Sequence, residues 1–150
     1  TTNDATSTRP LSGQCSGIRI SSTGSLQARG FTMRYCGYRG YGGNQAAAII
    51  IDGAPIEIRD ALFDNNYPYG IYAVNSENIS IENARFENHN SFAEWGSATA
   101  FTAFNSIVAF TNVDFTNNWL AIQSDTISTF TASIVNFLNN TVITSPEGLW

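Results

Sequence analysis

The sequence contains no lysine, and charged residues of any kind are scarce. All seven basic residues are arginines, twelve residues are acidic, and charged residues make up 13% of the 150 positions. Nucleic-acid binding needs clustered basic side chains that contact phosphates, so this composition excludes a typical nucleic-acid-binding protein. No apolar run approaches the roughly 18 residues of a transmembrane helix, so we expect no membrane span.

Histidine and cysteine are nearly missing as well. The chain has one histidine and two cysteines. A Ser, Thr or Cys nucleophile needs an adjacent base, and a single histidine supplies no evident candidate. Two cysteines allow one intramolecular disulfide, which is weak evidence for an oxidising compartment. The polarity that charges do not supply comes from Asn, Ser and Thr, which stack at strand spacing without the repulsion between like charges.

A short motif recurs along the chain. It consists of a small apolar residue, Phe two places later and Asn two places after that, at Ala61–Asn65, Ala84–Asn88, Val113–Asn117 and Val135–Asn139. A degenerate copy lies at Phe31–Cys36, with Met in the position of Phe. Successive Phe residues are 23, 29 and 22 positions apart. One basic period with loop insertions explains these spacings.

Alternating apolar residues precede each motif. They are Ile56 and Ile58, Ile79 and Ile81, Val108 and Phe110, and Phe130 and Ala132, preceded in turn by Ile49 and Ile51, Ile71 and Ala73, Ala100 and Thr102, and Ile122 and Ser124. This period of two marks strands with one buried face. Three short strands in about 23 residues fit one turn of a solenoid, and crossover rules favour a right-handed coil. The sequence therefore predicts an all-β, right-handed parallel β-helix of about five coils with three short strands each.

Stacked coils bring equivalent residues into columns. Met33 and the four motif phenylalanines are predicted to form an internal column, and Asn65, Asn88, Asn117 and Asn139 are predicted to form a corner ladder that satisfies turn backbone groups. On the outer face we expect Arg59 over Glu82, Arg34 over Asp64, Arg85 over Asp114 and, unfavourably, Asp64 over Glu87. The same register places Cys15 and Cys36 near one corner, which favours a disulfide between them.

These features resemble a known group of proteins. The Phe-x-Asn coils, together with Cys15–Ile20, Gly24–Leu26 and Met33–Gly37, look like the right-handed β-helix repeats of large bacterial surface proteins, which are related to pectate-lyase-like folds. The resemblance covers nearly the whole chain and implies a secreted or surface-exposed protein. Such repeats occur in lyases, hydrolases, adhesins and tail fibres, so no reaction follows from the fold. The Asn-Thr-Asp, Asp-Asp, Gly-His-Gly and Arg-Ile-Lys signatures of polygalacturonase-like enzymes are absent from the chain.

Acidic residues on the outer face are the weak candidates for a catalytic site. They are Asp60, Asp64, Glu82 and Glu87, with Arg59 and Arg85 nearby. Stacked Asp64 and Glu87 offer oxygen ligands that suit Ca²⁺. The interpretation that we favour is a solvated ladder of ion pairs, with no catalytic residue, metal or cofactor. His89 replaces the second Asn of the corner motif and is expected to be a hydrogen-bonded corner residue.

Aromatic residues in the loops that follow each motif are the candidates for ligand binding. They are Tyr38, Tyr41, Tyr67, Tyr69, Trp95 and Trp119. In a solenoid these loops emerge from one edge, where aromatic rings beside amides suit stacking on sugar rings or contacts with proteins. The alternative is that the rings fold back over the coil edge as a local lid.

The predicted function follows from these features. We expect residues 1–150 to form a single domain, with 1–14 as a polar loop leading into the first coil. Because neither end shows a capping helix, we predict a fragment of a longer solenoid, with end-to-end stacking of chains as the alternative. The favoured function is a non-catalytic extracellular spacer or adhesive module that contacts a polysaccharide or another surface protein. The competing hypothesis is a polysaccharide lyase or glycoside hydrolase, or its remnant.

Overall fold

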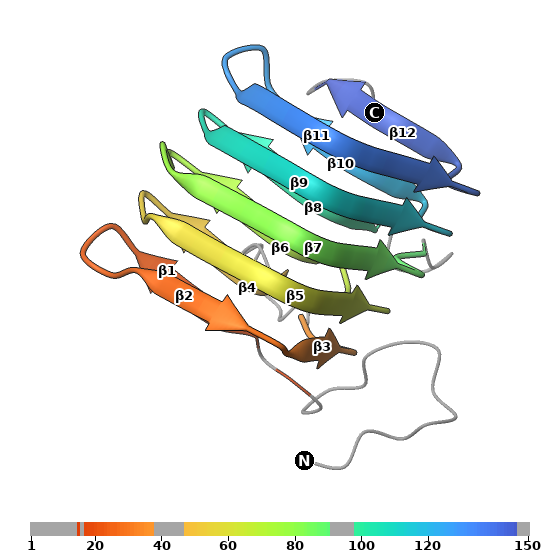
Figure 1. The fold of residues 1–150 in the computed structure, drawn as a ribbon, viewed down its shortest axis with the longest axis horizontal. Coiled ribbons are helices and arrows are strands. Elements are labelled where there is room, and N and C mark those ends of the chain that lie inside the picture. Colours follow the sequence, from red (N-terminus) through yellow and green to blue (C-terminus); the bar gives the residue numbers. More distant parts are fainter. Residues whose placement is uncertain (1–14, 16, 38–46, 91–97, 147–150) are drawn as a thin grey trace.

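The computed structural model describes residues 15, 17–37, 47–90 and 98–146, and these form parallel strands in two sheets. The short-strand sheet has the order β1-β4-β6-β8-β10-β12, and the long-strand sheet has the order β2-β5-β7-β9-β11 with β3 also paired to β5. Successive coils cross from one sheet to the other and stack along one axis (Figure 1). The described residues therefore form a right-handed parallel β-helix, as predicted. None of them forms a helix that is long and apolar enough to cross a membrane.

One sheet consists of strands of four to six residues, and the other has strands of nine or ten residues in every coil after the first. The short-strand sheet contains β1 (Ile18–Ser21), β4 (Ala47–Asp52), β6 (Tyr69–Val74), β8 (Thr99–Phe104), β10 (Leu120–Ser124) and β12 (Val142–Pro146). The long-strand sheet contains β2 (Leu26–Arg29), β3 (Thr32–Arg34), β5 (Ile56–Asp64), β7 (Ile79–Glu87), β9 (Ile107–Thr116) and β11 (Thr129–Leu138). Every pair of neighbouring strands is parallel.

The long strands bend at one residue of left-handed conformation. Asp60, Asn83, Asn112 and Ile134 have φ values of 54°, 52°, 54° and 57° in β5, β7, β9 and β11. Asn and Asp tolerate this region better than most residues. Gly30, with φ of 68°, separates β2 from β3 at the equivalent place. Two of the three strands predicted for each coil therefore run on as one bent strand in every coil after the first.

A file of stacked rings fills the interior, as predicted. Phe63 stacks on Phe86 with ring centroids 4.8 Å apart, Phe86 on Phe115 at 5.0 Å, and Phe115 on Phe137 at 5.3 Å, with planes within 11° of parallel. Met33 continues the file because it pairs in register with Phe63. The spacing matches the distance between parallel strands, so each ring covers the next.

One coil differs from the predicted register by a residue. Ile71 pairs with Phe101, not with Ala100, and the next inward pair is shifted in the same way. The ring of Phe101 packs edge-on against Phe86 in the interior. The prediction of Ala100 and Thr102 as inward residues is therefore wrong. The physical reason is that small or apolar residues occupy both alternating sets of β8, so alternation does not distinguish its two faces.

Candidate functional site

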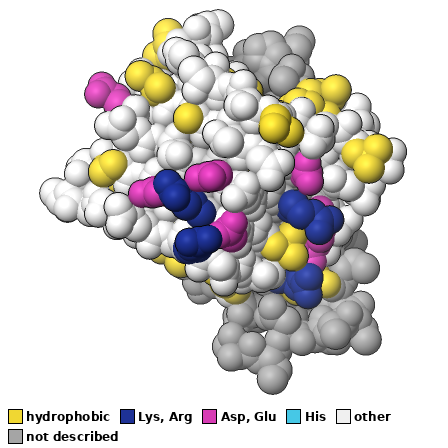
Figure 2. All heavy atoms as spheres, viewed as in Figure 1, with side chains coloured by type: hydrophobic (Ala, Val, Ile, Leu, Met, Phe, Trp, Pro, Cys, Tyr) yellow, Lys and Arg dark blue, Asp and Glu magenta, His cyan; other side chains and the backbone are white. Residues whose placement is uncertain are grey.

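Two groups of ion pairs lie on the outer face of the long-strand sheet (Figure 2). In the first group, Arg29 Nε lies 2.6 Å from Asp60 Oδ2. Arg59 lies between two acids, at 2.8 Å from Glu57 Oε1 on its own strand and 3.3 Å from Glu82 Oε2 on the next coil. The predicted pairing of Arg59 with Glu82 is therefore present, and both acids of this group that were catalytic candidates contact arginine.

Asp60 is held in its ionised form by its neighbours. Arg29 donates a hydrogen bond to its carboxylate, Asn83 Nδ2 donates a second at 3.1 Å, and together they hold the pKa of Asp60 below its ordinary value. A general acid in a sugar-cleaving site needs a raised pKa. The environment of Asp60 shifts its pKa in the opposite direction.

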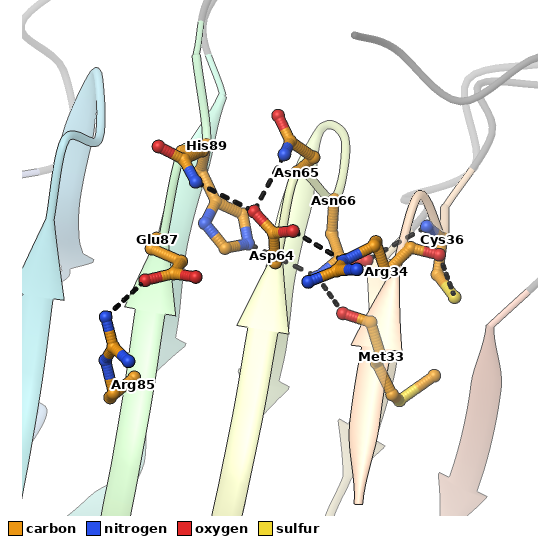
Figure 3. A network of polar contacts seen from close by, with 10 residues as sticks. Met33, Arg34, Cys36, Asp64, Asn65, Asn66, Arg85, Glu87 and His89 are labelled. Atoms are coloured by element: carbon orange, nitrogen blue, oxygen red, sulfur yellow. Dashed lines mark hydrogen bonds and ion pairs between the residues drawn. The ribbon is translucent and has the colours of Figure 1, made fainter. Parts of the chain in front are cut away.

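The second group centres on Asp64 at the end of β5 (Figure 3). Arg34 Nε lies 2.6 Å from Asp64 Oδ2, as predicted, and the side chain of Asp64 is almost fully buried. The amides of Asn65 and Asn88 both donate to Oδ1, at 2.7 and 2.9 Å. The carboxylate is therefore enclosed by one guanidinium and two amides.

Glu87 has a partner of its own. It pairs in register with Asp64, as expected, and accepts a 2.7 Å ion pair from Arg85 two residues earlier on β7. Arg85 also lies beside Asp114 in register, but its guanidinium contacts Glu87, and Asp114 accepts a hydrogen bond from Asn136 instead. The predicted register of Arg85 over Asp114 is confirmed, although the guanidinium forms its ion pair with Glu87.

The environment of Asp64 and Glu87 does not favour the Ca²⁺ interpretation. Calcium takes six to eight oxygen ligands, whereas both oxygens of Asp64 and Oε2 of Glu87 already accept bonds from arginine or amide groups. Within the described ranges, no three His, Cys, Asp or Glu side chains come together in a manner that suits a metal ion. This surface has the chemistry of an ion-pair ladder.

A buried amide ladder joins the coils at the corner that follows the long strands. It is built from the second polar residue of each motif: Asn66, His89, Asn118 and Asn140. In the coil below, Asn66 accepts from the backbone N–H of Cys36, and Asn118 accepts from that of His89. Their Nδ2 groups donate to main-chain oxygens of the same neighbouring coil, to Met33 O at 3.0 Å and to Phe86 O at 2.9 Å. Each side chain thus satisfies buried backbone groups at the corner.

The first Asn of the motif has a different role from the predicted one. Asn65, Asn88, Asn117 and Asn139 all have positive φ, between 53° and 62°. Their side chains lie nearer the surface, where Asn88 contacts Asp64 and Asn117 contacts Asn88 at 3.5 Å. The predicted Asn ladder is therefore present in part. The buried backbone groups, however, are satisfied by the residue that follows each of these Asn residues.

His89 is fully buried within the amide ladder. Its Nδ1 lies 3.0 Å from Asn118 Oδ1 and its Nε2 lies 3.4 Å from Asn66 Nδ2. These partners suit a neutral ring that donates from Nδ1 and accepts at Nε2. Burial lowers the pKa of His89 to about 4. The single histidine therefore forms hydrogen bonds within the corner, and its buried ring cannot reach a substrate.

Sequence reasoning missed two further ladders. Ser76 Oγ accepts from the N–H of Gly53, Ser106 Oγ from that of Ser76, and Ser128 Oγ from that of Ser106, at 3.1–3.2 Å. Along the bend of the long strands, Asn112 donates to Asn83, which donates to Asp60. The available signal was the recurrence of Ser and Asn at spacings close to those of the phenylalanines.

The aromatic candidates are only partly within the described residues. Tyr38, Tyr41 and Trp95 lie outside them. The side chain of Tyr67 is buried, so its ring presents no surface to a ligand. Tyr69 is half-buried with its ring 5.1 Å from that of Tyr72, and Trp119 is 37% exposed. A binding role for Tyr69 and Trp119 stays a prediction.

A disulfide joins Cys15 to Cys36 at the first corner. The N–H of Gly37 also donates to the carbonyl of Cys15 at 3.1 Å. The bridge thus connects the segment before β1 to the end of β3. The disulfide therefore cross-links the beginning and the end of the first coil.

A shallow groove of about 410 Å³ runs over the beginnings of β2, β5, β7 and β9. It is lined by Ser25, Leu26, Gln27, Pro55, Ile56, Glu57, Glu77, Asn78, Ile79, Ser80, Ile107 and Ala109. None of the candidate acids or described aromatic candidates lies in this groove. This groove and the candidate chemistry are therefore in different places on the surface.

The comparisons with known proteins identify a fold family. A family model described as a right handed beta helix region matches residues 16–147. No curated protein and no solved structure gives a significant match. The match covers nearly the whole chain and agrees with the parallel order of the strands in both sheets.

Proposed function

This chain belongs to the right-handed β-helix family, and from that premise we propose that it is a non-catalytic extracellular module, a rigid spacer or adhesive with an aromatic contact corner. One observation carries the proposal. Each of the four candidate acids, Asp60, Asp64, Glu82 and Glu87, contacts an arginine. Three of these four contacts run between adjacent coils. Asp60, Asp64 and Glu82 therefore form ion pairs that connect adjacent coils.

A hydrolase or lyase site would need a different arrangement. Two carboxyl groups must flank the scissile bond, one of them with a raised pKa. Here the pKa of Asp60 is lowered and Asp64 is enclosed by Arg34 and two amides. A substrate would have to displace these partners before it could reach either carboxylate.

The ladders suit a module that transmits force or sets a distance. The phenylalanine file, the buried amide ladder and the serine ladder connect successive coils at different places around the section of the solenoid. Bending the solenoid would stretch at least one of them. Fully satisfied buried networks of this kind rigidify a fold.

The disulfide supports the extracellular part of the proposal. Disulfides persist in oxidising environments such as the extracellular space and are rare in the cytosol. The bridge between Cys15 and Cys36 is therefore expected in a secreted or surface-exposed protein. In protein recovered from its natural source, Cys15 and Cys36 should carry no free thiol.

The contact corner is the turn from the long-strand sheet into the short-strand sheet. Tyr69 and the residue after Trp119 both start strands there, and β8 lies between those strands in the sheet. The two aromatic residues are thus two strand spacings apart along the axis, about 9.6 Å. Aromatic faces at such a corner suit stacking on a polysaccharide that runs along the solenoid.

Glycan-array binding tests the contact corner. The variant Tyr69→Ala/Trp119→Ala should lose binding by a factor of ten or more, and the matched Tyr69→Phe/Trp119→Phe variant should retain it because the ring faces remain. Equal binding by all three proteins would contradict the role of this corner. Catalysis is tested separately: release of reducing or unsaturated sugars by the wild type, lost in Asp64→Asn, would overturn the non-catalytic proposal.

A further inference from the structure

One asparagine on the outer face of the long-strand sheet has a side chain without a role in the fold. Asn78 lies immediately before β7, the strand between β5 and β9 in the sheet (Figure 1), and its side chain is exposed. Its main-chain oxygen accepts a hydrogen bond from the N–H of Ile56 at 2.8 Å. Its side-chain amide makes no hydrogen bond to any residue in the described part of the chain. The backbone of Asn78 is therefore fixed, while its amide nitrogen is open to solvent.

Nearly all other described asparagine side chains take part in hydrogen bonds. They are Asn65, Asn66, Asn75, Asn83, Asn88, Asn90, Asn105, Asn112, Asn117, Asn118, Asn136 and Asn140. Asn139, in the last described coil, is the other described exception. Asn78 has described coils on both sides. In a fold that bonds almost every amide, the unbonded amide of Asn78 requires an explanation of its own.

The sequence at Asn78 supplies that explanation. Asn78-Ile79-Ser80 matches the Asn-x-Ser/Thr sequon of N-linked glycosylation, and its middle residue is not proline. The other match in the 150 residues is Asn139-Asn140-Thr141. The two described asparagines without a side-chain hydrogen bond are thus the two that begin a sequon. The sequence pattern and the hydrogen bonding point independently to the same residues.

The local structure presents both recognised side chains of this sequon on one face. Successive side chains of a strand alternate between its two faces. Ile79 points into the core and is 2% exposed, so Asn78 and Ser80 lie on the outer face, and both are exposed. Both line the groove of about 410 Å³, together with Pro55 and Ile107. The groove leaves room for a sugar beside Asn78 without displacement of a core side chain.

We propose that Asn78 is a site of N-linked glycosylation. In the transfer, Nδ2 of Asn78 forms a bond to the anomeric carbon of a lipid-linked oligosaccharide diphosphate. The bond between that carbon and the diphosphate oxygen breaks, and the amide gives up one proton. The inference rests on the extracellular part of the proposed function, because an oligosaccharyltransferase acts on exported chains. The glycan covers the beginnings of β5, β7 and β9 and leaves the contact corner, which follows the ends of the long strands, free.

Peptide mass spectrometry of the protein from its natural source tests the site. Cleavage after arginine releases residues 60–85, a peptide that contains Asn78 and no other sequon. We expect this peptide to carry a glycan whose enzymatic release converts Asn78 to aspartate. An unmodified peptide would overturn the inference. The thiols of Cys15 and Cys36 report separately on the proposed function: a disulfide beside an unmodified Asn78 leaves the extracellular proposal standing, whereas free thiols would contradict it.

Matched variants, secreted by a host that carries the N-glycosylation machinery, test the recognition of the sequon. Asn78→Gln replaces the acceptor by a longer amide and Ser80→Ala removes the sequon hydroxyl, so both should lose the glycan on residues 60–85 completely. Ser80→Thr keeps the sequon and should retain the glycan. Because both positions are exposed, all three variants should unfold at the same urea concentration as the wild type after glycan removal. A wild-type peptide without glycan, or a glycan that persists in Asn78→Gln or Ser80→Ala, would overturn the proposal.

Discussion

The first and last described coils follow the same repeat, but equivalent side chains in them differ in exposure. Met33 and Phe137 occupy the same interior file, yet Met33 is 8% exposed and Phe137 is 37% exposed. β11 keeps the register of β9 over its length, but most of its side chains are exposed. In a solenoid each coil contacts only its neighbours. The repeat therefore determines the register of a coil, while the burial of that coil depends on what lies beyond it.

The largest expected effect comes from truncating the ring file at its centre. Phe86→Ala removes a fully buried ring that is stacked on both sides, which should cost about 3–5 kcal/mol of unfolding free energy. The matched Phe137→Ala removes a ring stacked on one side only and should cost about 1–2 kcal/mol. Urea unfolding measures both. Equal losses would mean that the ring of Phe137 is covered in solution.

Removing the disulfide should weaken the closed end. Cys15→Ala/Cys36→Ala opens a loop of 21 residues in sequence separation, which in the chain-entropy model costs about 3 kcal/mol. Chemical unfolding of the variant measures the loss. Adding reductant should destabilise the wild type by a similar amount and leave the variant unchanged. A wild type that is insensitive to reductant would show that the bridge contributes little.

The buried histidine makes the interior sensitive to pH. Burial lowers the pKa of His89 to about 4, below the value of about 6.5 for an unfolded chain. The unfolded state therefore binds the proton first, and stability falls as pH decreases from about 6.5 to about 4, by as much as about 3 kcal/mol. His89→Asn restores the residue found at Asn118 and Asn140 and should remove most of this dependence in that window. Unfolding midpoints at a series of pH values test it, and an unchanged slope in His89→Asn would contradict it.

The fold could be predicted from the sequence because its signal repeats. Four Phe-x-Asn motifs set the phase of the long strands, and Phe63, Phe86, Phe115 and Phe137 stack as expected. The prediction was wrong at β8, where Phe101 takes the inward position. That coil contains the longest spacing between motifs and has apolar residues in both alternating sets, so neither spacing nor alternation determines its register.

The candidate site was predictable only at the level of pairs in register. Arg59 contacts Glu82 and Arg34 contacts Asp64, as strand stacking implies. Arg85 instead contacts Glu87, because residues two apart on a strand share a face and compete with the neighbour on the next coil.

The role of the corner residues required coordinates. Asn65 and its equivalents adopt a left-handed conformation, and it is Asn66 and its equivalents whose amides satisfy the buried backbone groups. A sequence motif shows which residues recur at a corner. It does not show which of two adjacent polar side chains enters the interior.

The smallest expected effect would make the last coil more like the others. Ile134 has φ of 57° at the bend where the preceding coils have Asp60, Asn83 and Asn112. A β-branched residue is strained in this region, whereas Asn tolerates it. Ile134→Asn should therefore stabilise the chain by about 1 kcal/mol, partly because its amide extends the ladder in which Asn112 donates to Asn83. Ile134→Gly serves as the control, since it relieves the strain without supplying an amide. Thermal unfolding that ranks the proteins Asn above Gly above Ile would separate the two contributions, and a destabilised Ile134→Asn would contradict the strain at this bend.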